Sequence, residues 1–422
     1  MMKRLALLIL MLGLMAGCGG GSSSSSATTN SLQYLISQIV RPQLDKHQRL
    51  KIGVAIGVVG PGAKGFGEVA SRIFLFGRLT DQNGNRLALN ESTEFEIGSV
   101  TKTFTATVLA SLLQSQPGLL DTSINSIFSG TPTFGMGMEA ATIGDLANYT
   151  SGLPDSNRGN GSASCTFSGG TIDDCYDFTL LFEQLADPTF TTLQFAPGTS
   201  YLYSDLGFAL LALAEPVLNG SMATDPLTLL AQWEELVRTI VLTPLGMNST
   251  HAFDPVSDPP LLPKAYRREA SGKIDVALGY NTSWPAFIGA GGIVSTPADM
   301  LLYLEYQLGL LDTPLNALLT VLHSPSTDVT TGAGEHIGLG WFIGTLRGSN
   351  NLTFISKNGS VPGFTTQIDF APSTNTGVFV LANAANDPGQ TPLVDVARIA
   401  SQILQLINGI LPTSPGPSGD QP

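Results

Sequence analysis

Charged side chains are scarce in this sequence. Asp, Glu, Lys and Arg make up 13% of its 422 residues, whereas hydrophobic residues make up 43%. This balance excludes a disordered chain, which combines high charge with little apolar surface to bury. A chain of this length can bury a full core, as one large two-part domain or as two domains.

Basic residues are scarcer than acidic ones, 20 against 33, and the formal net charge is −13. An acidic surface repels nucleic acids and anionic lipid headgroups, so we expect neither as the main partner. Histidine is rarer still. The four histidines are scattered, without the spacing of metal ligands, at His47, His251, His323 and His336. We therefore expect no metal site.

The first residues lack the length of a membrane span. The apolar run at residues 5–17 is shorter than the roughly 20 residues that a bilayer requires, and it follows the cations Lys3 and Arg4. That arrangement is typical of a secretory signal peptide, so we expect residues 1–17 to direct export. Residues 19–30 are rich in Gly and Ser, and we expect residues 18–30 to form a flexible tether.

Only three cysteines are present. Cys18 ends the segment L-M-A-G-C, which resembles a bacterial lipoprotein cleavage box and would make Cys18 the lipid-bearing first residue of the mature chain. The alternative is an ordinary signal peptide cut near Ala16. Cys165 and Cys175 lie in a polar, Gly-rich stretch, and export would bring them into an oxidising compartment. We expect them to form a disulfide that staples a surface loop, with two free thiols as the alternative.

These features together predict an exported lipoprotein. It would lie on the periplasmic side of the envelope, with the outer membrane as its expected location. The lipid anchor would be its only contact with the membrane.

Apolar patterns place strands near both chain ends and helices between them. Strand patterns cover residues 52–59, 73–78, 337–343, 352–356, 365–370 and 377–383. The clearest helix patterns cover residues 31–48, 101–114, 208–218, 227–242 and 392–408. The expected fold class is α/β, of the α+β kind. We expect one antiparallel sheet built from both chain ends and flanked by helices, with a mostly helical insertion at about residues 121–290. The domain would span residues 31–410, with a ligand cleft beside the insertion and a disordered tail at 411–422.

Ser99 and Lys102 are three residues apart at the start of a predicted helix. Residues i and i+3 share a helix face, so the amine of Lys102 can reach the hydroxyl of Ser99. A serine hydroxyl is a poor nucleophile until a base lies beside it. The N-terminus of the helix adds partial positive charge and free backbone N–H groups. The pair therefore predicts a nucleophilic serine.

Six sequence blocks extend this pattern along the chain. In order they read I-G-S-V-T-K-T-F-T-A at 97–106, Y-T-S-G-L-P at 149–154, F-A-P-G-T-S-Y-L-Y-S-D at 195–205, P-L-G-M-N-S-T at 244–250, G-A-G-G-I-V-S-T-P-A-D-M at 289–300 and K-N-G-S-V-P-G-F at 357–364. The set resembles the serine β-lactamase and penicillin-binding protein superfamily. It is most similar to the branch that holds class C β-lactamase, D-alanyl-D-alanine carboxypeptidase and related esterases. The resemblance covers roughly residues 50–405.

The resemblance implies a role for each matching residue. Ser99 would be the nucleophile and Lys102 its partner, and Tyr203 would shuttle the proton with the lysine. Lys357, Asn358 and Gly359 match the substrate-binding Lys-Thr-Gly block. The backbone N–H groups of Ser99 and Ser360 would form the oxyanion hole.

Two positions depart from the pattern of the family. Asp205 stands where the Tyr-Ser-Asn block has Asn, and Asn358 stands where the Lys-Thr-Gly block has Thr. A carboxylate near Lys102 would hold that lysine charged, so Tyr203, as a phenolate with its pKa lowered by the ammonium, would serve as the base. Alternatively, Ser204 and Asp205 could correspond to the Ser-Asp-Asn block of other branches.

The expected reaction is acyl transfer through an acyl-enzyme, which needs no cofactor. The expected substrates are D-alanyl peptides of peptidoglycan, β-lactams, or both. Two alternatives are an esterase on the same fold and a non-catalytic sensor that binds penicillin or peptides.

Overall fold

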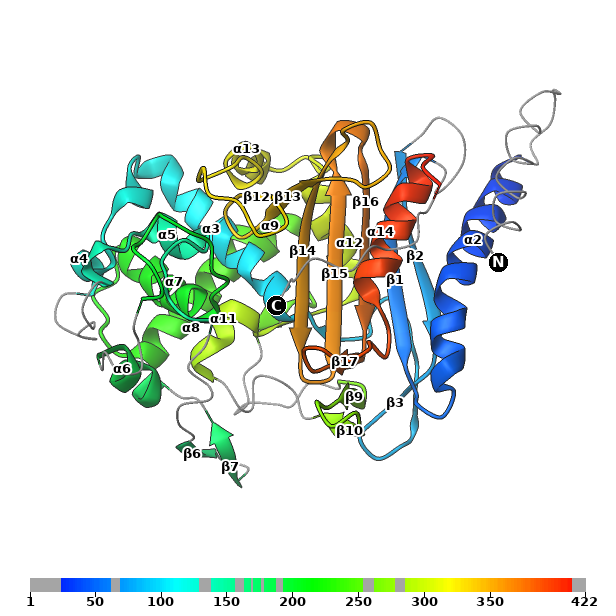
Figure 1. Ribbon diagram of the computed structural model, residues 1–422, viewed down its shortest axis with the longest axis horizontal. Coiled ribbons are helices and arrows are strands. Elements are labelled where there is room, and N and C mark those ends of the chain that lie inside the picture. The colour runs from blue at the N-terminus through cyan, green and yellow to red at the C-terminus, as the bar shows by residue number, and fades with distance from the viewer. Residues whose placement is uncertain are drawn as a thin grey trace.

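The computed structural model describes residues 24–61, 69–128, 138–155, 163–167, 170–175, 178–186, 193–252, 262–277 and 285–411. Its centre is a seven-stranded antiparallel sheet in the order β12-β13-β14-β15-β16-β1-β2 (Figure 1). The strands are β1 (Gly53–Pro61), β2 (Val69–Gly77), β12 (His336–Ile337), β13 (Phe342–Thr345), β14 (Thr353–Val361), β15 (Phe364–Ala371) and β16 (Thr376–Ala382). β1 pairs with β16, so strands from both chain ends share one sheet, as the sequence predicts.

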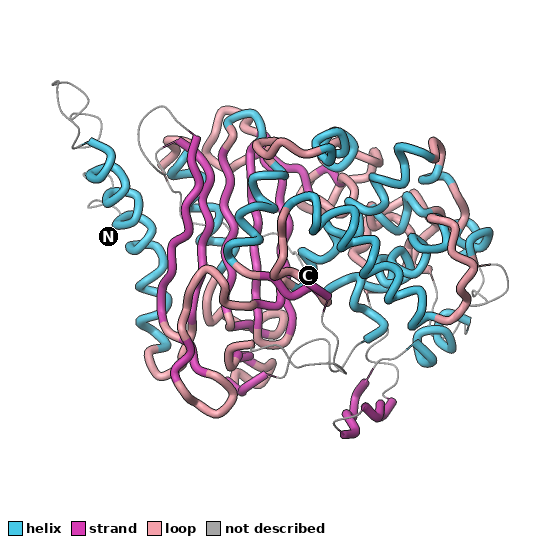
Figure 2. Tube along the Cα trace, turned by 180° about the vertical axis from the view of Figure 1, so that it is seen from behind, coloured by secondary structure: helices cyan, strands magenta, loops and turns pink. Residues whose placement is uncertain are grey.

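Helices cover both faces of this sheet (Figure 2). α2 (Ser24–Leu44) and α14 (Val396–Ile407) pack on the face that carries Val54, Ile56 and Val380. On the other face, α3 (Thr101–Ser115) and α12 (Pro297–Gln307) pack against a core that includes Phe379. Gly57 of β1 leaves room for the ring of Phe379, since an added Cβ would lie 2.0 Å from it.

The helical insertion lies beside the sheet and is confirmed as a mostly helical unit (Figure 1). Its helices are α4 (Ile124–Ile127), α5 (Ile143–Ala147), α6 (Phe178–Ala186), α7 (Asp205–Leu218), α8 (Pro226–Leu236), α9 (Thr243–Leu245) and α11 (Ile288–Gly291). A π-helical turn over Val237–Leu242 continues α8. Outside the insertion, α13 (Leu319–Leu322) precedes β12.

Small strand groups complete the fold. They are β3 (Leu79–Thr80) with β4 (Arg86–Leu87), β5 (Phe95–Glu96) with β8 (His251–Ala252) and β11 (Ile293–Ser295), β9 (Ala265–Arg268) with β10 (Ile274–Ala277) and β17 (Ala384–Asn386), and β6 (Ala163–Phe167) with β7 (Gly170–Cys175). None of the described helices combines the length and the apolar character that crossing a membrane requires.

The N-terminal helix starts earlier than its apolar pattern suggests. α2 begins at Ser24, so Ser24–Asn30, which we expected in the tether, is helical. The expected signal peptide, the lipidation site Cys18 and most of the expected tail at 411–422 lie outside the described residues.

The two remaining cysteines belong to the β6–β7 hairpin. Cys165 lies opposite Ile172, and Cys175 lies opposite Ala163. The side chains of both cysteines lie outside the described part of the chain, so their disulfide stays a prediction. We expect intact-mass measurement before and after reduction to reveal one bond, whose closure contributes about 2–3 kcal/mol. Two alkylatable thiols in the unreduced exported protein would contradict it.

Helix α7 carries a buried acid that no catalytic role explains. Glu215 is fully buried, and the contact that favours its charged form is a poorly aligned hydrogen bond with the backbone of Leu109, which does not outweigh burial. Burial therefore raises the pKa of Glu215 well above its usual value.

We expect Glu215→Gln to stabilise the protein at neutral pH but not at low pH. A raised folded-state pKa leaves stability intact below the unfolded pKa of about 4.3. Stability is then lost as the pH rises, by at most about 1.4 kcal/mol per pH unit. Melting temperatures of the wild type and the variant should therefore coincide near pH 4 and separate toward pH 8. A constant difference across this range would show that ionisation of Glu215 is not the cause.

Candidate active site

The site lies where the start of α3 meets strand β14. A short 3₁₀ turn over Gly98–Val100 precedes α3 and puts Ser99 at its N-terminus, half-buried. An added Cβ on Gly359 would lie 2.0 Å from the carbonyl oxygen of Ile97, and one on Gly98 would lie 2.8 Å from the nitrogen of Ser360. Only glycine permits this approach, and Gly98 also has a φ of +54°. The backbone nitrogens of Ser99 and Ser360 therefore lie at one junction.

Sheet topology leaves room for this junction. β13 pairs with residues 353–356 of β14, whereas residues 357–361 pair only with β15 among the described strands. The unpaired edge of β14 faces the turn before α3. The Lys-Asn-Gly block at 357–359 is therefore next to Ser99, as its match to the family predicts.

Lys102 is fully buried and its amine makes three hydrogen bonds. Nζ lies 3.1 Å from Ser99 Oγ, 2.5 Å from Asp205 Oδ1 and 2.8 Å from the carbonyl oxygen of Ala290. An ammonium has three N–H donors, which matches these acceptors. The carboxylate of Asp205 also stabilises the charged form of the buried amine. Lys102 is therefore an ammonium that donates to Ser99, and the expected contact between Asp205 and Lys102 is present.

The N-cap residue and the first residue of α7 have different roles. Ser204 caps the helix, because its Oγ accepts from Gly207 N at 2.9 Å and donates to the carbonyl oxygen of Pro154 at 2.8 Å. Asp205 instead turns toward Lys102. Its backbone N donates to Asp155 Oδ1 at 3.3 Å. The hydroxyl of Ser204 is thus used locally, while the carboxylate of Asp205 belongs to the site.

The ring of Tyr203 lies between two lysines. Lys102 Nζ is 4.9 Å and Lys357 Nζ is 4.8 Å from its centroid, distances at which a cation is attracted to the ring. Tyr149 stacks on Tyr203 with the ring centroids 4.9 Å apart. Lys357 Nζ also lies 3.4 Å from the phenol oxygen. Tyr203 therefore connects the lysine of α3 with the lysine of β14.

The pKa of Tyr203 differs from the sequence-based expectation. Burial raises the pKa of Tyr203 well above 10, and the charge of Asp205 adds to the rise. A hydrogen bond with Ser99 opposes this shift but does not outweigh it. The expectation that the Lys102 ammonium lowers this pKa is wrong, because Asp205 balances the charge of the lysine and burial then dominates. The resting side chain is a phenol.

Lys357 shows the opposite shift. Its side chain is fully buried, and burial followed by repulsion from Lys102 lowers the pKa of Lys357 well below 10.5. Its described hydrogen-bond partners are the phenol of Tyr203 and Asn358 Oδ1, the latter at 3.3 Å. A neutral amine is therefore accessible at this position, and it can accept a proton from Tyr203.

Sequence reasoning missed two residues that shape the site. Tyr149 supports the ring of Tyr203 from a strained backbone, with a φ of +61°, and its hydroxyl contacts the carbonyl oxygen of Gly340 at 3.4 Å. Asp155 brings a second carboxylate close to Asp205. Tyr149 opens the block at 149–154 and Asp155 follows that block directly, so the block was the available signal.

The described residues contain no group of three or more His, Cys, Asp or Glu side chains that could hold a metal ion. The groups that the structure brings together are hydroxyls, amines and carboxylates. These groups can move a proton away from Ser99, and backbone N–H groups face the same junction. Both features are what acyl transfer to a serine requires.

Comparisons with known proteins agree with this geometry. The family model described as Beta-lactamase matches residues 36–401. The D-alanyl-D-alanine-carboxypeptidase/endopeptidase AmpH of Escherichia coli (strain K12) is 26% identical over 352 residues, covering 79% of this chain and 80% of that protein. A Beta-lactamase of Pseudomonas fluorescens is 25% identical over 330 residues, covering 70% of this chain and 80% of that protein.

Solved structures show the same fold. A class C beta-lactamase superposes with a TM-score of 0.66 at 21% identity, covering 92% of this chain and 98% of that one. The D-alanine carboxypeptidase AmpC from Burkholderia cenocepacia has a TM-score of 0.64 at 21% identity, covering 90% and 99% of the two chains.

Proposed function

The chain belongs to the beta-lactamase family, a family of serine hydrolases, and from this premise we propose that it forms an acyl-enzyme at Ser99. One observation carries the proposal. The half-buried hydroxyl of Ser99 lies 3.1 Å from the amine of Lys102, hydrogen-bonds with Tyr203 and adjoins the backbone of Ser360. A nucleophile, its proton acceptor and two backbone donors therefore meet at one point.

Protons would move along a relay of three side chains. As Ser99 Oγ attacks a carbonyl carbon, its proton passes to Tyr203 Oη, while the phenol proton passes to neutral Lys357 Nζ. The Lys102 ammonium, held by Asp205, keeps Ser99 oriented and stabilises the negative charge that develops on Oγ. The same relay in reverse delivers the proton from Lys357 to the leaving group. Water then attacks the acyl-enzyme and releases Ser99.

The developing oxyanion would be bound by the backbone N–H groups of Ser99 and Ser360. Losing one such donor typically costs 10²–10³ in rate. The glycine contacts between Gly98, Gly359 and their opposite strands support this role, because they hold the two nitrogens in fixed positions.

The substrates we propose are D-alanyl peptides of peptidoglycan, β-lactams, or both. Two relatives, a D-alanyl-D-alanine-carboxypeptidase/endopeptidase and a Beta-lactamase, support these classes. An esterase is the second candidate. Asp205 and Asn358 replace the Asn and Thr of the family pattern, and the carboxylates of Asp205 and Asp155 disfavour a substrate with a free carboxylate. A non-catalytic sensor would not need Ser99, Lys102 and Tyr203 together.

One experiment separates the candidates. The purified protein is incubated separately with a fluorescent penicillin, a D-alanyl-D-alanine peptide and a p-nitrophenyl ester, and the turnover of each is measured. Peptide or penicillin turnover supports the first candidate, and ester turnover alone supports the second. Labelling without turnover of any of the three would favour the sensor. The absence of both labelling and turnover with all three compounds would refute the proposal.

We also propose that the chain is exported and anchored through a lipid on Cys18. The box L-M-A-G-C and the preceding apolar run support this. Cys18→Ser should move the protein from the membrane fraction to the soluble fraction, because the acyl chains supply the binding energy of a lipoprotein. Fractionation with immunoblotting checks this, with the wild type as control. A variant that remains in the membrane fraction would point to a different anchor.

A further inference from the structure

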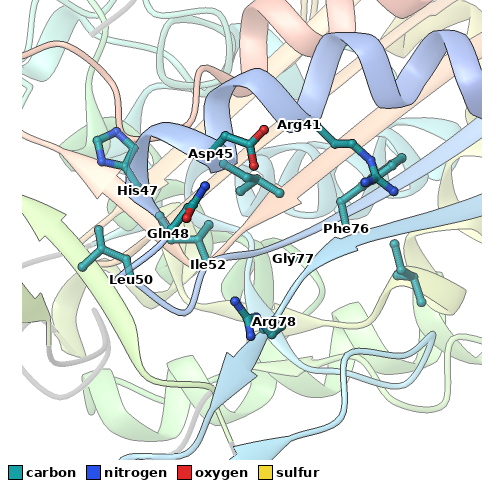
Figure 3. Close-up of a pocket in the computed structure, with 11 residues that line it drawn as sticks. Arg41, Asp45, His47, Gln48, Leu50, Ile52, Phe76, Gly77 and Arg78 are labelled. Atoms are coloured by element: carbon teal, nitrogen blue, oxygen red, sulfur yellow. The ribbon is translucent and has the colours of Figure 1, made fainter.

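A pocket on the opposite side of the sheet from Ser99 has no part in the proposed reaction. It has a volume of about 270 Å³ and lies between the end of α2 and strand β2 (Figure 3). Leu44, Leu50 and Phe76 supply apolar lining, together with Leu75, which is 37% exposed. The pocket borders the core between the sheet and helices α2 and α14. The catalytic groups pack on the other face.

Two arginines reach this pocket from its two sides. Arg41 extends from α2, and Arg78 follows the end of β2 (Figure 3). Both are exposed, and within the described part of the chain neither makes an ion pair. Asp45 and His47 also line the pocket. The guanidinium groups therefore retain donors for an anion, which a planar guanidinium binds well.

Further basic residues have their backbone next to residues that line the pocket or act electrostatically on His47, although they are far apart in sequence. Arg78 N bonds to the carbonyl oxygen of Ile52, next to Lys51. Asn383 joins Lys51 and Lys264 by bonding to both of their carbonyl oxygens, at 3.0 Å and 2.7 Å. Charges on Arg268 and Lys46 act on His47, and burial together with these charges lowers the pKa of His47. We name the set of Arg41, Lys46, Lys51, Arg78, Lys264 and Arg268 the basic cluster.

The basic cluster is unusual for this chain. It holds six of the 20 Lys and Arg residues of a protein whose net charge is −13. Arg268 Nε is buried without a hydrogen-bond partner among the described residues. Asp45 is the acidic residue that lines the pocket itself. Glu269 and Asp387 adjoin Arg268, so the six basic residues outnumber the three acidic ones near the pocket. This positive charge beside an opening with apolar walls is complementary to an amphiphilic anion.

We propose that this pocket binds the phosphate headgroup of an anionic phospholipid. Arg41 and Arg78 would hold the phosphate, and the rest of the basic cluster would attract the membrane surface. Leu44, Leu50 and Phe76 would contact the glycerol and the first carbons of the acyl chains. The inference goes beyond the proposed hydrolase function and does not depend on it. It departs from the expectation that the lipid anchor is the only contact with the membrane, because the net charge of −13 does not describe the local charge at this pocket.

Such binding would orient the molecule. α2 has 21 residues and is therefore about 30 Å long. Its first residue lies closest in sequence to Cys18, and its last turn borders the pocket. An anchor at one end and a headgroup at the other would lay α2 along the membrane. The side of the sheet that carries Ser99 would then face away from the lipid (Figure 1).

The test uses the mature chain, from residue 18 onward, with Cys18→Ser, so that neither the lipid nor the apolar run at residues 5–17 contributes. Flotation with vesicles of phosphatidylglycerol and phosphatidylcholine measures the partition coefficient, and pure phosphatidylcholine serves as the neutral reference. We expect Arg41→Gln combined with Arg78→Gln to lower binding to the anionic vesicles about 30-fold, or about fivefold for each basic residue. Leu44→Ser should weaken binding as well, because it makes the apolar lining polar. The matched control combines Arg238→Gln with Arg347→Gln, which changes the net charge equally at exposed positions away from the pocket.

The outcomes are distinct. Loss of binding in the pocket variants, with the control within about threefold of the parent, supports the proposal. Equal loss in the control would show that net charge alone drives adsorption. Unchanged binding in the pocket variant would also overturn the proposal. Soluble glycerol phosphate that binds as tightly as the vesicles would indicate an anion site without lipid specificity. Circular dichroism and thermal unfolding verify that each variant is folded.

Discussion

Ser99→Ala is expected to abolish covalent labelling and to lower turnover by at least about 10⁴-fold. Without the hydroxyl no acyl-enzyme can form, and only binding and the backbone donors remain. The measurement combines kcat on the best substrate with labelling by a fluorescent penicillin or a fluorophosphonate. The lysine that contacts Ser99 Oγ at 3.1 Å stays in place in this variant, because Asp205 and Ala290 still hold it.

A matched control lies on the same helix. Ser115→Ala removes a hydroxyl from the far end of α3, where it bonds only locally, to the carbonyl oxygen of Leu112. This variant should retain full activity and labelling. Peptide mapping then identifies the labelled residue. Label on another serine, with Ser99 unmodified, would show that the nucleophile is wrong.

Tyr203→Phe is expected to lower kcat by about 10²–10⁴, the usual contribution of a general base. The ring would still stack on Tyr149 and lie between the two lysines, so the loss reports the hydroxyl alone. Tyr201→Phe is the matched control. Tyr201 lies two residues before Tyr203 in the chain, and its ring packs edge-on against the same Tyr149. A nearly silent Tyr203→Phe would mean that the proton of Ser99 leaves by another route.

Asp205→Asn tests the charge balance around this relay. The carboxylate raises the pKa of Tyr203, and it opposes the downward shift of the pKa of Lys357. Removing its charge should lower both pKa values. Deprotonation of Lys357 sets the acidic limb of the rate profile and deprotonation of Tyr203 the alkaline limb. Both limbs should therefore shift to lower pH while activity at the optimum is retained. Loss of activity in Asp205→Asn together with a silent Tyr203→Phe would assign Ser204 and Asp205 to a different relay.

The sequence alone determined the features that depend on local geometry or on pattern. Ser99 and Lys102 were predicted to touch because i and i+3 positions share a helix face. Apolar or alternating runs at both chain ends predicted one antiparallel sheet, since the backbone groups of such strands need partners in a ladder while the helices between them can cover the faces. The six ordered blocks predicted the family, which the match over residues 36–401 confirms.

Tertiary structure decided the protonation of the site and the location of charge. Lys102, Tyr203 and Lys357 meet from three distant parts of the chain, and their proton affinities depend on burial and on the charge that each one faces. The sequence shows neither the burial of a side chain nor the charge that it faces. It therefore predicted a phenolate at Tyr203, whereas burial favours a phenol there and a neutral amine at Lys357. The net charge of −13 likewise hid the basic cluster. That cluster forms because the fold brings the end of α2, the end of β2 and strand β9 of a separate small sheet together in space. Electrostatic potential depends on distance in space rather than on position in the chain.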